Sequence, residues 1–330
     1  MSHTFSSKPS ADEVATASTD HLPLISVITP SYNQGMYIAQ TIESVLRQDY
    51  PKIEYWVIDG GSTDETLAVL HRYESDPRLR WISEPDDGQS HAINKGLMLV
   101  KGELFSWLNS DDLLECGALS QVARAWRSHE PAVIYGKARY INASGQDLGP
   151  LPGQIKDMTL AKLLHPTRYT LPQPATFAPT ALVRDLGGLD VTLHFTMDFD
   201  LWVRLGKQVP FRFIPYNLAR FRLHLQSKTI AMPGKFIQDI DQVIARTIRS
   251  GLLTARQGQV QFDLFSAQIY LSSHRKNLSM AMRHLTRAVL LDPSVGSDVL
   301  LILAKGLGRS VLGEKTWSML RRWKPELQLI

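Results

Sequence analysis

Residues 24–109 alternate short apolar runs with stretches whose apolar residues recur three and four positions apart. Continuous β-branched runs predict strands buried on both faces, and the helical spacing predicts amphipathic helices. The predicted strands are 24–29, 55–59, 80–84 and 104–109, and the helices between them are 38–48, 67–70 and 91–100. This order predicts an α/β fold built from βαβ units, with a mostly parallel sheet flanked by helices.

Beyond residue 109, the rest of the chain divides into two parts with different patterns. A helix is expected at 115–129, a strand at 132–141, a hairpin or loop at 142–154, a short helix at 157–166, a helix at 199–205 and one or two strands within 211–224. Beyond Gln226, long amphipathic patterns predict helices to the end of the chain. We therefore expect one large domain followed by a C-terminal helical extension.

Composition narrows the functional classes. The 330 residues carry a net charge of +4 and 21% charged residues, without the dense basic stripe of a nucleic-acid-binding protein. The single cysteine, Cys116, excludes an intramolecular disulfide and fits a reducing compartment, so we expect a cytoplasmic protein. Residues 1–22 are predicted to be a disordered leader. No apolar run reaches the roughly 18 residues of a membrane-spanning helix.

Carboxylates follow three of the predicted strands. They are Asp59, the pair Asp86 and Asp87, and the pair Asp111 and Asp112. Because ligands of open α/β sheets bind beyond the carboxyl ends of the strands, these acids are expected to meet in one cleft. Several carboxylates together favour a divalent cation with oxygen ligands, and Mg²⁺ or Mn²⁺ commonly binds one or two carboxylates plus substrate phosphates.

Seven ordered motifs make the chain resemble the family 2 glycosyltransferases, which have the GT-A fold. They are ISVITPSYNQGMYIAQTIESVLRQ at 25–48, VIDGGSTDET at 57–66, SEPDDGQSHAINKGL at 83–97, WLNSDDLL at 107–114, QPATF at 173–177, GGLD at 187–190 and MDFDLWVRL at 197–205. The resemblance implies a catalytic domain at 23–228, with a nucleotide-binding half at 23–114 and an acceptor half at 115–228, before a helical region at 229–330.

The resemblance assigns the donor's nucleotide to the first two strand ends. It implies that Pro30, Tyr32 and Asn33 shape the nucleotide pocket and that Asp59 binds the base, usually uracil. The alternative for Asp59 and Asp64 is that they cap the following helix, which we favour for Asp64.

The resemblance places Asp87 near the ribose or sugar of the donor, where Gly88 permits a close backbone approach. A type I turn at 85–88 is an alternative compatible with that role. The resemblance also makes Asp111 and Asp112 the metal-binding acids, with Asp111 near the nucleotide sugar. In this motif, Asn109 stands where the family has its first acid, and an amide oxygen can still bind a metal. The alternative is that these aspartates only cap the next helix.

Asp198 matches the position of the family's catalytic base, which takes the proton of the acceptor hydroxyl. Met197 precedes it where the family often has Glu. Asp200 points about 200° away from Asp198 on a helix, and we interpret it as a charge that favours the helix N-terminus. Trp202 is expected either in the core, which we favour, or on the acceptor side.

Three weaker expectations concern the second half. His224 resembles a histidine near the metal or diphosphate, or else is an ordinary hydrogen-bonded histidine. Its neighbours Arg220, Arg222 and Lys228 are candidates to neutralise phosphates. Gln173 resembles an acceptor-side residue or is a turn residue.

The sequence thus predicts a metal-dependent, inverting transfer of a sugar from a nucleotide-diphosphate sugar, usually UDP-linked, to a saccharide or lipid-linked saccharide in cell-surface polysaccharide or glycolipid synthesis. One alternative is a non-catalytic nucleotide-sugar-binding module. A sugar nucleotidyltransferase is disfavoured because the SYNQGMY loop at 31–37 lacks Lys and Arg. Residues 297–313 either pack on the protein or contact the inner face of a membrane peripherally.

Overall fold

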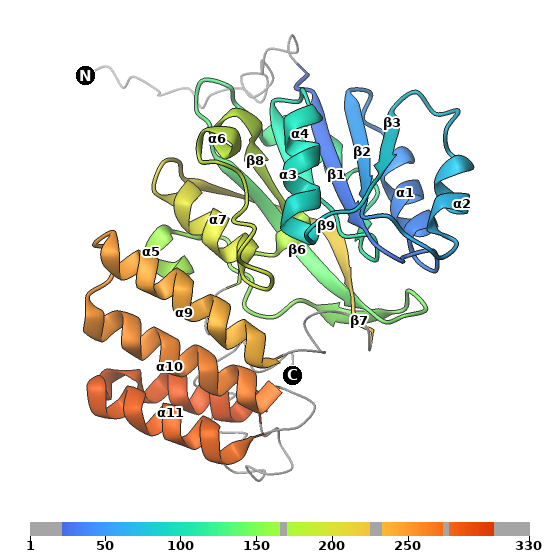
Figure 1. Cartoon of the computed structure of the whole chain (residues 1–330). Coiled ribbons are helices and arrows are strands. Elements are labelled where there is room, and N and C mark those ends of the chain that lie inside the picture. The colour runs from blue at the N-terminus through green and yellow to red at the C-terminus, as the bar shows by residue number, and fades with distance from the viewer. Residues whose placement is uncertain (1–21, 166–169, 225–232, 273–276, 307–330) are drawn as a thin grey trace, which may run out of the picture.

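The computed structural model describes residues 22–165, 170–224, 233–272 and 277–306. Nearly all of the predicted leader and the last 24 residues lie outside these ranges. The description therefore covers the predicted catalytic region and most of the helical region after it (Figure 1).

The described strands form one mixed sheet in the order β3-β2-β1-β4-β8-β6-β9-β5, with β7 paired to β6. Their bounds are β1 Ile25–Ser31, β2 Ile53–Asp59, β3 Leu79–Ser83, β4 Leu104–Trp107, β5 Leu113–Leu114, β6 Val133–Ile141, β7 Asp147–Pro150, β8 Thr176–Pro179 and β9 Phe211–Arg222. The first four strands pair in parallel, as the sequence predicts. Because β8 is antiparallel to both β4 and β6, and β9 is parallel to β6, the strands β6 and β9 again run in the direction of β4.

Helices cover both faces of this sheet. Their bounds are α1 Ile38–Leu46, α2 Thr66–His71, α3 Gln89–Leu99, α4 Ala118–Ala125, α5 Leu160–Leu163, α6 Thr180–Asp185 and α7 Met197–Gly206. In β1, Val27 faces the core under α1, α2 and α4, while Ile28 faces the core under α3, α6 and α7. Alternate residues of one strand thus pack into two different cores, one on each face of the sheet. This explains why the apolar run of the strand is continuous.

Strand β1 is longer than the sequence predicts. The expected strand stops at Thr29, whereas β1 continues through Pro30 to Ser31 and pairs these residues with Ile58 and Asp59 of β2. The pairing with β4 ends at Ile28, so the missing N–H of Pro30 falls beyond that ladder. A proline can therefore lie in a central strand here.

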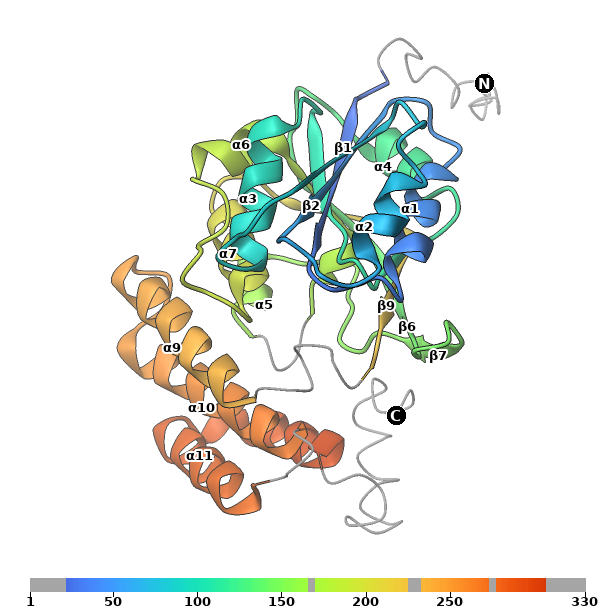
Figure 2. The ribbon, with the colours of Figure 1, turned by 45° about the vertical axis from the view of Figure 1, so that its right-hand side comes forward.

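The helices after the sheet are α9 Pro233–Arg249, α10 Ala255–Ser272 and α11 Leu278–Leu291, followed by a 3₁₀ turn η3 Pro293–Val295. They stack below the sheet domain, with α9 nearest to it (Figures 1 and 2). Val243 of α9 belongs to the core that includes α3 and α7, whereas α10 and α11 share a separate apolar core. Helix α9 therefore connects the sheet domain with the helical hairpin.

The segment 297–313, for which packing or membrane contact was expected, lies only partly within the described residues. Residues 297–306 are helical and bury Leu301, Ile302 and Ala304, which agrees with the packing alternative for this part. Residues 307–313 lie outside the description. Among the described helices, none combines the length and apolarity that crossing a bilayer requires.

Candidate active site

The carboxyl ends of the parallel strands bring the predicted site residues to one edge of the sheet. Ser31, Asp59 and Ser83 are aligned across β1, β2 and β3. His224 follows the end of β9, and Asp111 follows β4. The loop after β4 and the segment after β9, more than a hundred residues apart in sequence, therefore meet at this edge.

The loop after β1 is fastened to the loop after β2. Asn33 has a left-handed backbone (φ 53°), a conformation that Asn tolerates better than most residues. Its backbone N–H donates to Ser62 Oγ at 2.7 Å, and its side-chain oxygen accepts from the N–H of Thr63 at 2.9 Å. Tyr32, next to it, is 61% exposed. The nucleotide pocket predicted at Pro30, Tyr32 and Asn33 thus has a fixed backbone and an exposed aromatic side chain.

Asp59 is fully buried and both of its carboxylate oxygens accept hydrogen bonds. Oδ2 accepts from the N–H groups of Gly61 and Ser62 and from Ser83 Oγ, at 3.1, 2.8 and 2.7 Å. Oδ1 accepts from Ser62 Oγ at 2.5 Å. In this conformation Asp59 holds together the ends of β2 and β3, and its contact with a base stays a prediction.

Asp64 acts near the start of α2, as the capping alternative predicts. Its carboxylate accepts from the N–H groups of Thr66 and Gly35 at 2.9 Å each. Desolvation opposes ionisation, but the hydrogen bonds from Thr66 and Gly35 hold the pKa of Asp64 below its ordinary value. Asp64 therefore stabilises the joint between the first two loops.

The loop after β3 presents Asp87 to solvent. Its side chain is 91% exposed, and one oxygen lies 3.2 Å from His91 Nδ1. Gly88 has φ 111°, a conformation that favours glycine, and its N–H donates to Asp86 Oδ1 at 2.8 Å. Asp86 itself lies against Gly60, where an added Cβ would come within 2.8 Å of the carboxylate. The Asp86 side chain thus organises the turn, and the Asp87 side chain stays exposed to solvent.

A chain of amide groups joins the start of α3, the loop after β4 and Gln173. Gln89 Nε2 donates to Asn109 Oδ1 at 2.7 Å, and Asn109 Nδ2 lies 3.1 Å from Asp112 Oδ2 and 3.4 Å from Gln173 Oε1. Gln173 in turn donates to the carbonyl of Trp107 at 2.7 Å. The side chain of Asn109 is therefore engaged on both its oxygen and its nitrogen, so the amide in the acidic motif organises the site in this arrangement.

Asp111 and His224 form a polar pair that is less deeply buried than Asp112. Asp111 Oδ2 lies 2.8 Å from His224 Nε2, and their side chains are 18% and 7% exposed. The His224 ring also packs against Tyr37, with ring centroids 4.9 Å apart. Two potential metal ligands, His224 just after β9 and Asp111 in the loop after β4, thus lie side by side, and a role of His224 near a metal stays a prediction.

Asp112 is enclosed. It is 1% exposed, and its oxygens face the backbone N–H of Arg222 at 2.8 Å and the amide of Asn109 at 3.1 Å. Burial and the neighbouring charge of Asp111 raise the pKa of Asp112 well above its ordinary value. This environment favours Asp111 over Asp112 as the direct ligand of a metal.

The two arginines at the end of β9 are used differently from our expectation that they neutralise phosphates. Arg222 is 1% exposed and donates to backbone carbonyls of Asp111, at 2.7 Å, and of Ala143, at 3.0 Å, and to Gln40 Oε1 at 2.8 Å. Arg220 forms a two-bond ion pair with Glu115, both bonds 2.8 Å long. Both guanidinium groups therefore bind the protein, and Lys228 lies outside the described residues.

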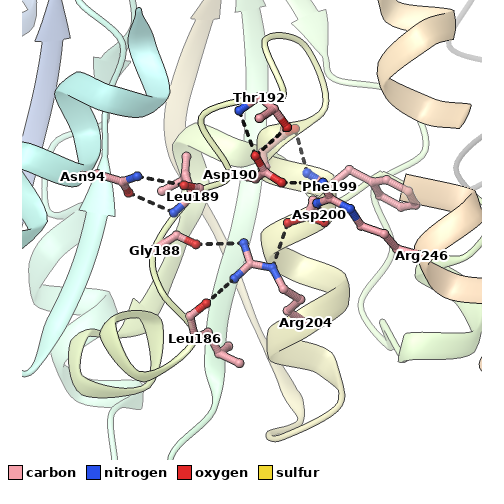
Figure 3. A network of polar contacts seen from close by, with 11 residues as sticks. Asn94, Leu186, Gly188, Leu189, Asp190, Thr192, Phe199, Asp200, Arg204 and Arg246 are labelled. Carbon is pink, nitrogen blue, oxygen red and sulfur yellow. Dashed lines mark hydrogen bonds and ion pairs between the residues drawn. The ribbon is translucent and has the colours of Figure 1, made fainter. Parts of the chain in front are cut away.

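Asp198 lies in the first turn of α7, half-buried, and accepts from the N–H of Phe199 at 2.8 Å. Burial raises the pKa of Asp198 to about 6. Asp200 is 3% exposed and binds Arg204 at 2.7 Å and Arg246 at 3.1 Å, within the polar network of Figure 3. The two aspartates thus have separate environments, one a weakened acid and the other a buried ion pair.

Trp202 lies in the core. It is 2% exposed and stacks on Trp107 with centroids 5.4 Å apart, which favours the packing alternative over the acceptor-side one. The stack also connects α7 with β4, whose end leads to Asp111. A second connection is the hydrogen bond of 3.2 Å from Ser90 Oγ, in the first turn of α3, to the carbonyl of Leu193, before α7. These two contacts connect α7 and the segment before it with β4 and α3.

The potential metal ligands at this edge of the sheet fit a hard divalent cation in part. No group of three or more His, Cys, Asp or Glu side chains in the described residues is arranged to hold a metal. Mg²⁺ and Mn²⁺ sites often use only one or two protein groups and complete their coordination with phosphate oxygens and water. Asp111 and His224 suit such a site.

Three residues of this region were not identified by sequence reasoning. Gln89 joins the amide chain, while Asp239 and Arg246 of α9 reach the segment before Asp198. Asp239 and Arg246 are seven positions apart, about two helical turns, so they share one face of the helix. That spacing was visible in the sequence, but the target of this face was not.

Comparisons with known proteins identify a family match and several relatives. The family described as "Glycosyl transferase family 2" matches residues 26–177. A chondroitin synthase of Escherichia coli is 29% identical over 211 residues, which are 62% of this chain and 29% of that protein. An uncharacterised glycosyltransferase of Rickettsia felis is also 29% identical, over 62% of this chain and 35% of that protein. The chain thus spans about a third of the length of these relatives.

Two solved structures share the fold. Residues 1–349 of S. aureus TarS in complex with UDP-GlcNAc align with a TM-score of 0.58 at 19% identity, over 85% of this chain and 87% of that one. The mannosyltransferase PcManGT of Pyrobaculum calidifontis, in complex with GDP-Man and Mn²⁺, aligns with a TM-score of 0.58 at 18% identity, over 94% of this chain and 86% of that one. The family match thus identifies residues 26–177 as a glycosyl transferase family 2 region, and the likeness to the two solved structures shows that the chain has the GT-A fold.

Proposed function

We propose that this chain transfers a sugar from a UDP-linked donor to a hydroxyl of a saccharide or lipid-linked saccharide, with inversion, during synthesis of a cell-surface polysaccharide or glycolipid. The observation that carries the proposal is the position of Asp198. Its carboxyl group has a pKa raised to about 6 and lies in the first turn of α7, directly after a segment that accepts a hydrogen bond from Ser90 of α3. A base whose pKa lies nearer to neutrality accepts a proton more effectively than an ordinary aspartate.

Donor binding is proposed for the loops after β1, β2 and β3. Tyr32 and Asn33 would contact the nucleotide, and the exposed carboxylate of Asp87 would accept hydrogen bonds from ribose or sugar hydroxyls. Asp59 would contribute by holding the loop rigid or, after exchange of one of its internal hydrogen bonds, by binding the base. The UDP-GlcNAc complex of a structural neighbour supports a UDP-linked donor, and the name of the chondroitin synthase relative supports a saccharide product.

Catalysis is proposed to use Asp198 and the pair Asp111 and His224. As the acceptor oxygen attacks the anomeric carbon, its proton passes to the Asp198 carboxylate and the bond to the diphosphate breaks on the opposite face. Asp111 and His224 would hold Mg²⁺ or Mn²⁺, which when bound offsets negative charge on the leaving diphosphate. Arg222 donates a hydrogen bond to the backbone carbonyl of Asp111 and so holds this residue in place.

Gln173 is proposed to lie on the acceptor side, at the end of the amide chain. Its oxygen faces Asn109 and its nitrogen holds the carbonyl of Trp107. The acceptor would therefore meet a polar wall that is continuous with the donor loops. The identity of the acceptor sugar would be decided by contacts around this wall.

The test compares nucleotide sugars with and without Mn²⁺. UDP-GlcNAc, UDP-glucuronic acid and GDP-mannose are screened for protection against thermal unfolding, because a ligand at 100 times its Kd stabilises the native state by about 2.7 kcal/mol. We expect protection by a UDP-sugar that increases with Mn²⁺. Protection by GDP-mannose alone would refute the proposed donor.

Turnover is then followed as release of UDP in the presence of saccharide acceptors. We expect Asp198→Asn to abolish it while donor protection remains, whereas Asp185→Asn, an exposed carboxylate of α6, leaves it unchanged. Full activity of Asp198→Asn would remove this residue from the role of base. Donor binding without any turnover of the unaltered protein would identify a non-catalytic module.

A further inference from the structure

Helix α9 binds both ends of the segment that leads into α7. We infer that Asp239 and Arg246 of this helix are positioning residues that hold Asp198 in the geometry needed for transfer. The inference rests on the proposed function, in which Asp198 is the base. It assigns part of the catalytic geometry to the region that follows the family-matched part of the chain.

Asp239 holds the segment directly before α7. Its Oδ2 accepts from the backbone N–H groups of His194 and Phe195, both at 2.7 Å. Asp239 is only 5% exposed, so these bonds to a charged acceptor are shielded from water. Charge-assisted bonds of this length are among the stronger hydrogen bonds in proteins. They fix the backbone three residues ahead of Asp198.

Arg246 holds the segment at its start and beyond Asp198. One guanidinium nitrogen lies 2.5 Å from Asp190 Oδ2, and another lies 3.1 Å from Asp200 Oδ1 (Figure 3). Asp200 also accepts from Arg204 at 2.7 Å, so its buried carboxylate is held by two guanidinium groups. Although desolvation works in the opposite direction, hydrogen bonds from Thr192 and Arg246 keep the pKa of Asp190 below its ordinary value. Arg246 thus bridges the carboxylates of Asp190 and Asp200, which come before and after Asp198 in the sequence.

The two anchors flank an apolar contact on the same face of α9. Val243, which lies between them, is 1% exposed and belongs to the core that contains α7. The spacing of four and three residues places Asp239, Val243 and Arg246 in one row. The helix therefore meets the sheet domain through a sequence of charged, apolar and charged contacts, which fixes its register against α7.

Other elements complete the frame around the segment. Asn94 of α3 exchanges two hydrogen bonds with the backbone of Leu189, at 2.8 and 2.9 Å, and Arg204 donates to the carbonyls of Leu186 and Gly188 (Figure 3). These contacts hold the GGLD turn, but they end before Asp190. From Asp190 to the first turn of α7, the charged contacts from other elements come from α9, beside one neutral hydrogen bond from Ser90 of α3 to the carbonyl of Leu193. Loss of the α9 anchors would therefore loosen the portion that carries Asp198.

The expected effect falls on the chemical step. A displacement of about 1 Å in a catalytic group can lower a rate by about a hundredfold, whereas the donor loops after β1, β2 and β3 make none of the α9 contacts described above. The variants Arg246→Met and Asp239→Asn are compared with Arg249→Met and Asp241→Asn, which make the same changes at exposed positions of the same helix. With UDP-GlcNAc and Mn²⁺ as the probe, we expect kcat for UDP release to fall by about 10- to 100-fold and KM to change by less than about threefold.

Rescue separates a positioning role from loss of the fold. Arg246→Lys retains the charge but not the fork that bridges Asp190 and Asp200, so it should recover only part of kcat. Amide hydrogen exchange supplies a readout without turnover: residues 190–199 should exchange faster in Arg246→Met than in Arg249→Met, while β1 to β4 stay unchanged. Equal exchange in the two variants would overturn the inference even if no acceptor or donor is turned over.

The outcomes distinguish the two proposals. If Asp198→Asn is inactive while Arg246→Met and Asp239→Asn keep the kcat of their controls, the inference is wrong and the proposed function stands. If Asp198→Asn is fully active, the proposed base is wrong, and the exchange of 190–199 still decides whether α9 holds the segment. A global loss of protection in Arg246→Met would transfer the decision to Arg246→Lys, in which a normal kcat would overturn the inference.

Discussion

Replacing Asp198 by Asn is expected to stabilise the protein at neutral pH while abolishing transfer. Burial raises the pKa of Asp198 from 3.8 to about 6, a change of about 2 units. One pKa unit corresponds to about 1.4 kcal/mol, so the ionised carboxylate costs the native state at most about 3 kcal/mol. Asn has nearly the same shape, carries no charge, and its oxygen can still accept from the N–H of Phe199. The cost should therefore disappear in the variant.

The pH dependence gives the sign of the effect. Because the native state holds the Asp198 proton more tightly than the unfolded chain, the stability contributed by protonation is fully present below about pH 4 and is lost as pH rises to about 6. The Asn variant has no such loss. Its free energy of unfolding should exceed that of the unaltered protein by about 1–3 kcal/mol above pH 7, and the difference should shrink as pH falls below 6.

Urea unfolding at pH 5, 6, 7 and 8 measures this difference, with Asp185→Asn as the exposed control whose stability should change by less than about 0.5 kcal/mol. The same ionisation should appear as an acid limb near pH 6 in kcat/KM for transfer, because the base must be deprotonated. A stability difference that is constant across this pH range, or a variant less stable at pH 8, would refute the reasoning about burial.

Three further predictions concern the metal edge. Asp111→Asn should reduce the Mn²⁺-dependent gain in UDP affinity by about tenfold or more in calorimetry, and an unchanged gain would show that Asp111 is not a ligand. Asn109→Asp replaces an amide 3.1 Å from Asp112 with a second carboxylate, so thermal unfolding should occur earlier without Mn²⁺ and recover in part with it; equal loss in both conditions would contradict the electrostatic cause. Arg222→Met leaves buried carbonyls without donors and should lower the free energy of unfolding by about 3–5 kcal/mol in urea, whereas Arg47→Met, at a side chain that is 78% exposed, should change it by less than about 0.5 kcal/mol. A small effect of Arg222→Met would show that water replaces its contacts.

Local patterns were sufficient where burial and spacing decide the structure. The helix expected at 38–48 is α1, Ile38–Leu46, and the strand expected at 55–59 is the second part of β2, Ile53–Asp59. Their apolar residues pack within a few turns or across adjacent strands, so the sequence carries the signal directly. The same reasoning predicted that loop aspartates meet at one edge, because topology alone brings the carboxyl ends of parallel strands together.

Short strands and long-range polar contacts were not predictable. Strand β5 has two residues and β8 has four, too few to show a period, and both depend on partners distant in sequence. The enclosure of Asp112 and the engagement of Asn109 by Gln89 depend on which side chains the folded loops bring within reach. Residue types suggested a chemistry for these positions, but only the fold shows that Asp112 is more deeply buried than Asp111.

The contacts that Asp239, Val243 and Arg246 of α9 make with α7 and the segment before it, here called the seam, also affect where the polypeptide can be divided. A fragment ending at 228, where the composition changes, would lack Asp239 and Arg246 and would expose the apolar patch that Val243 covers. Its buried Asp200 would lose one of two neutralising guanidinium groups. A truncation after Arg249 keeps this seam intact, so the smallest portion suitable for enzymology extends through α9 even though the family match ends at residue 177.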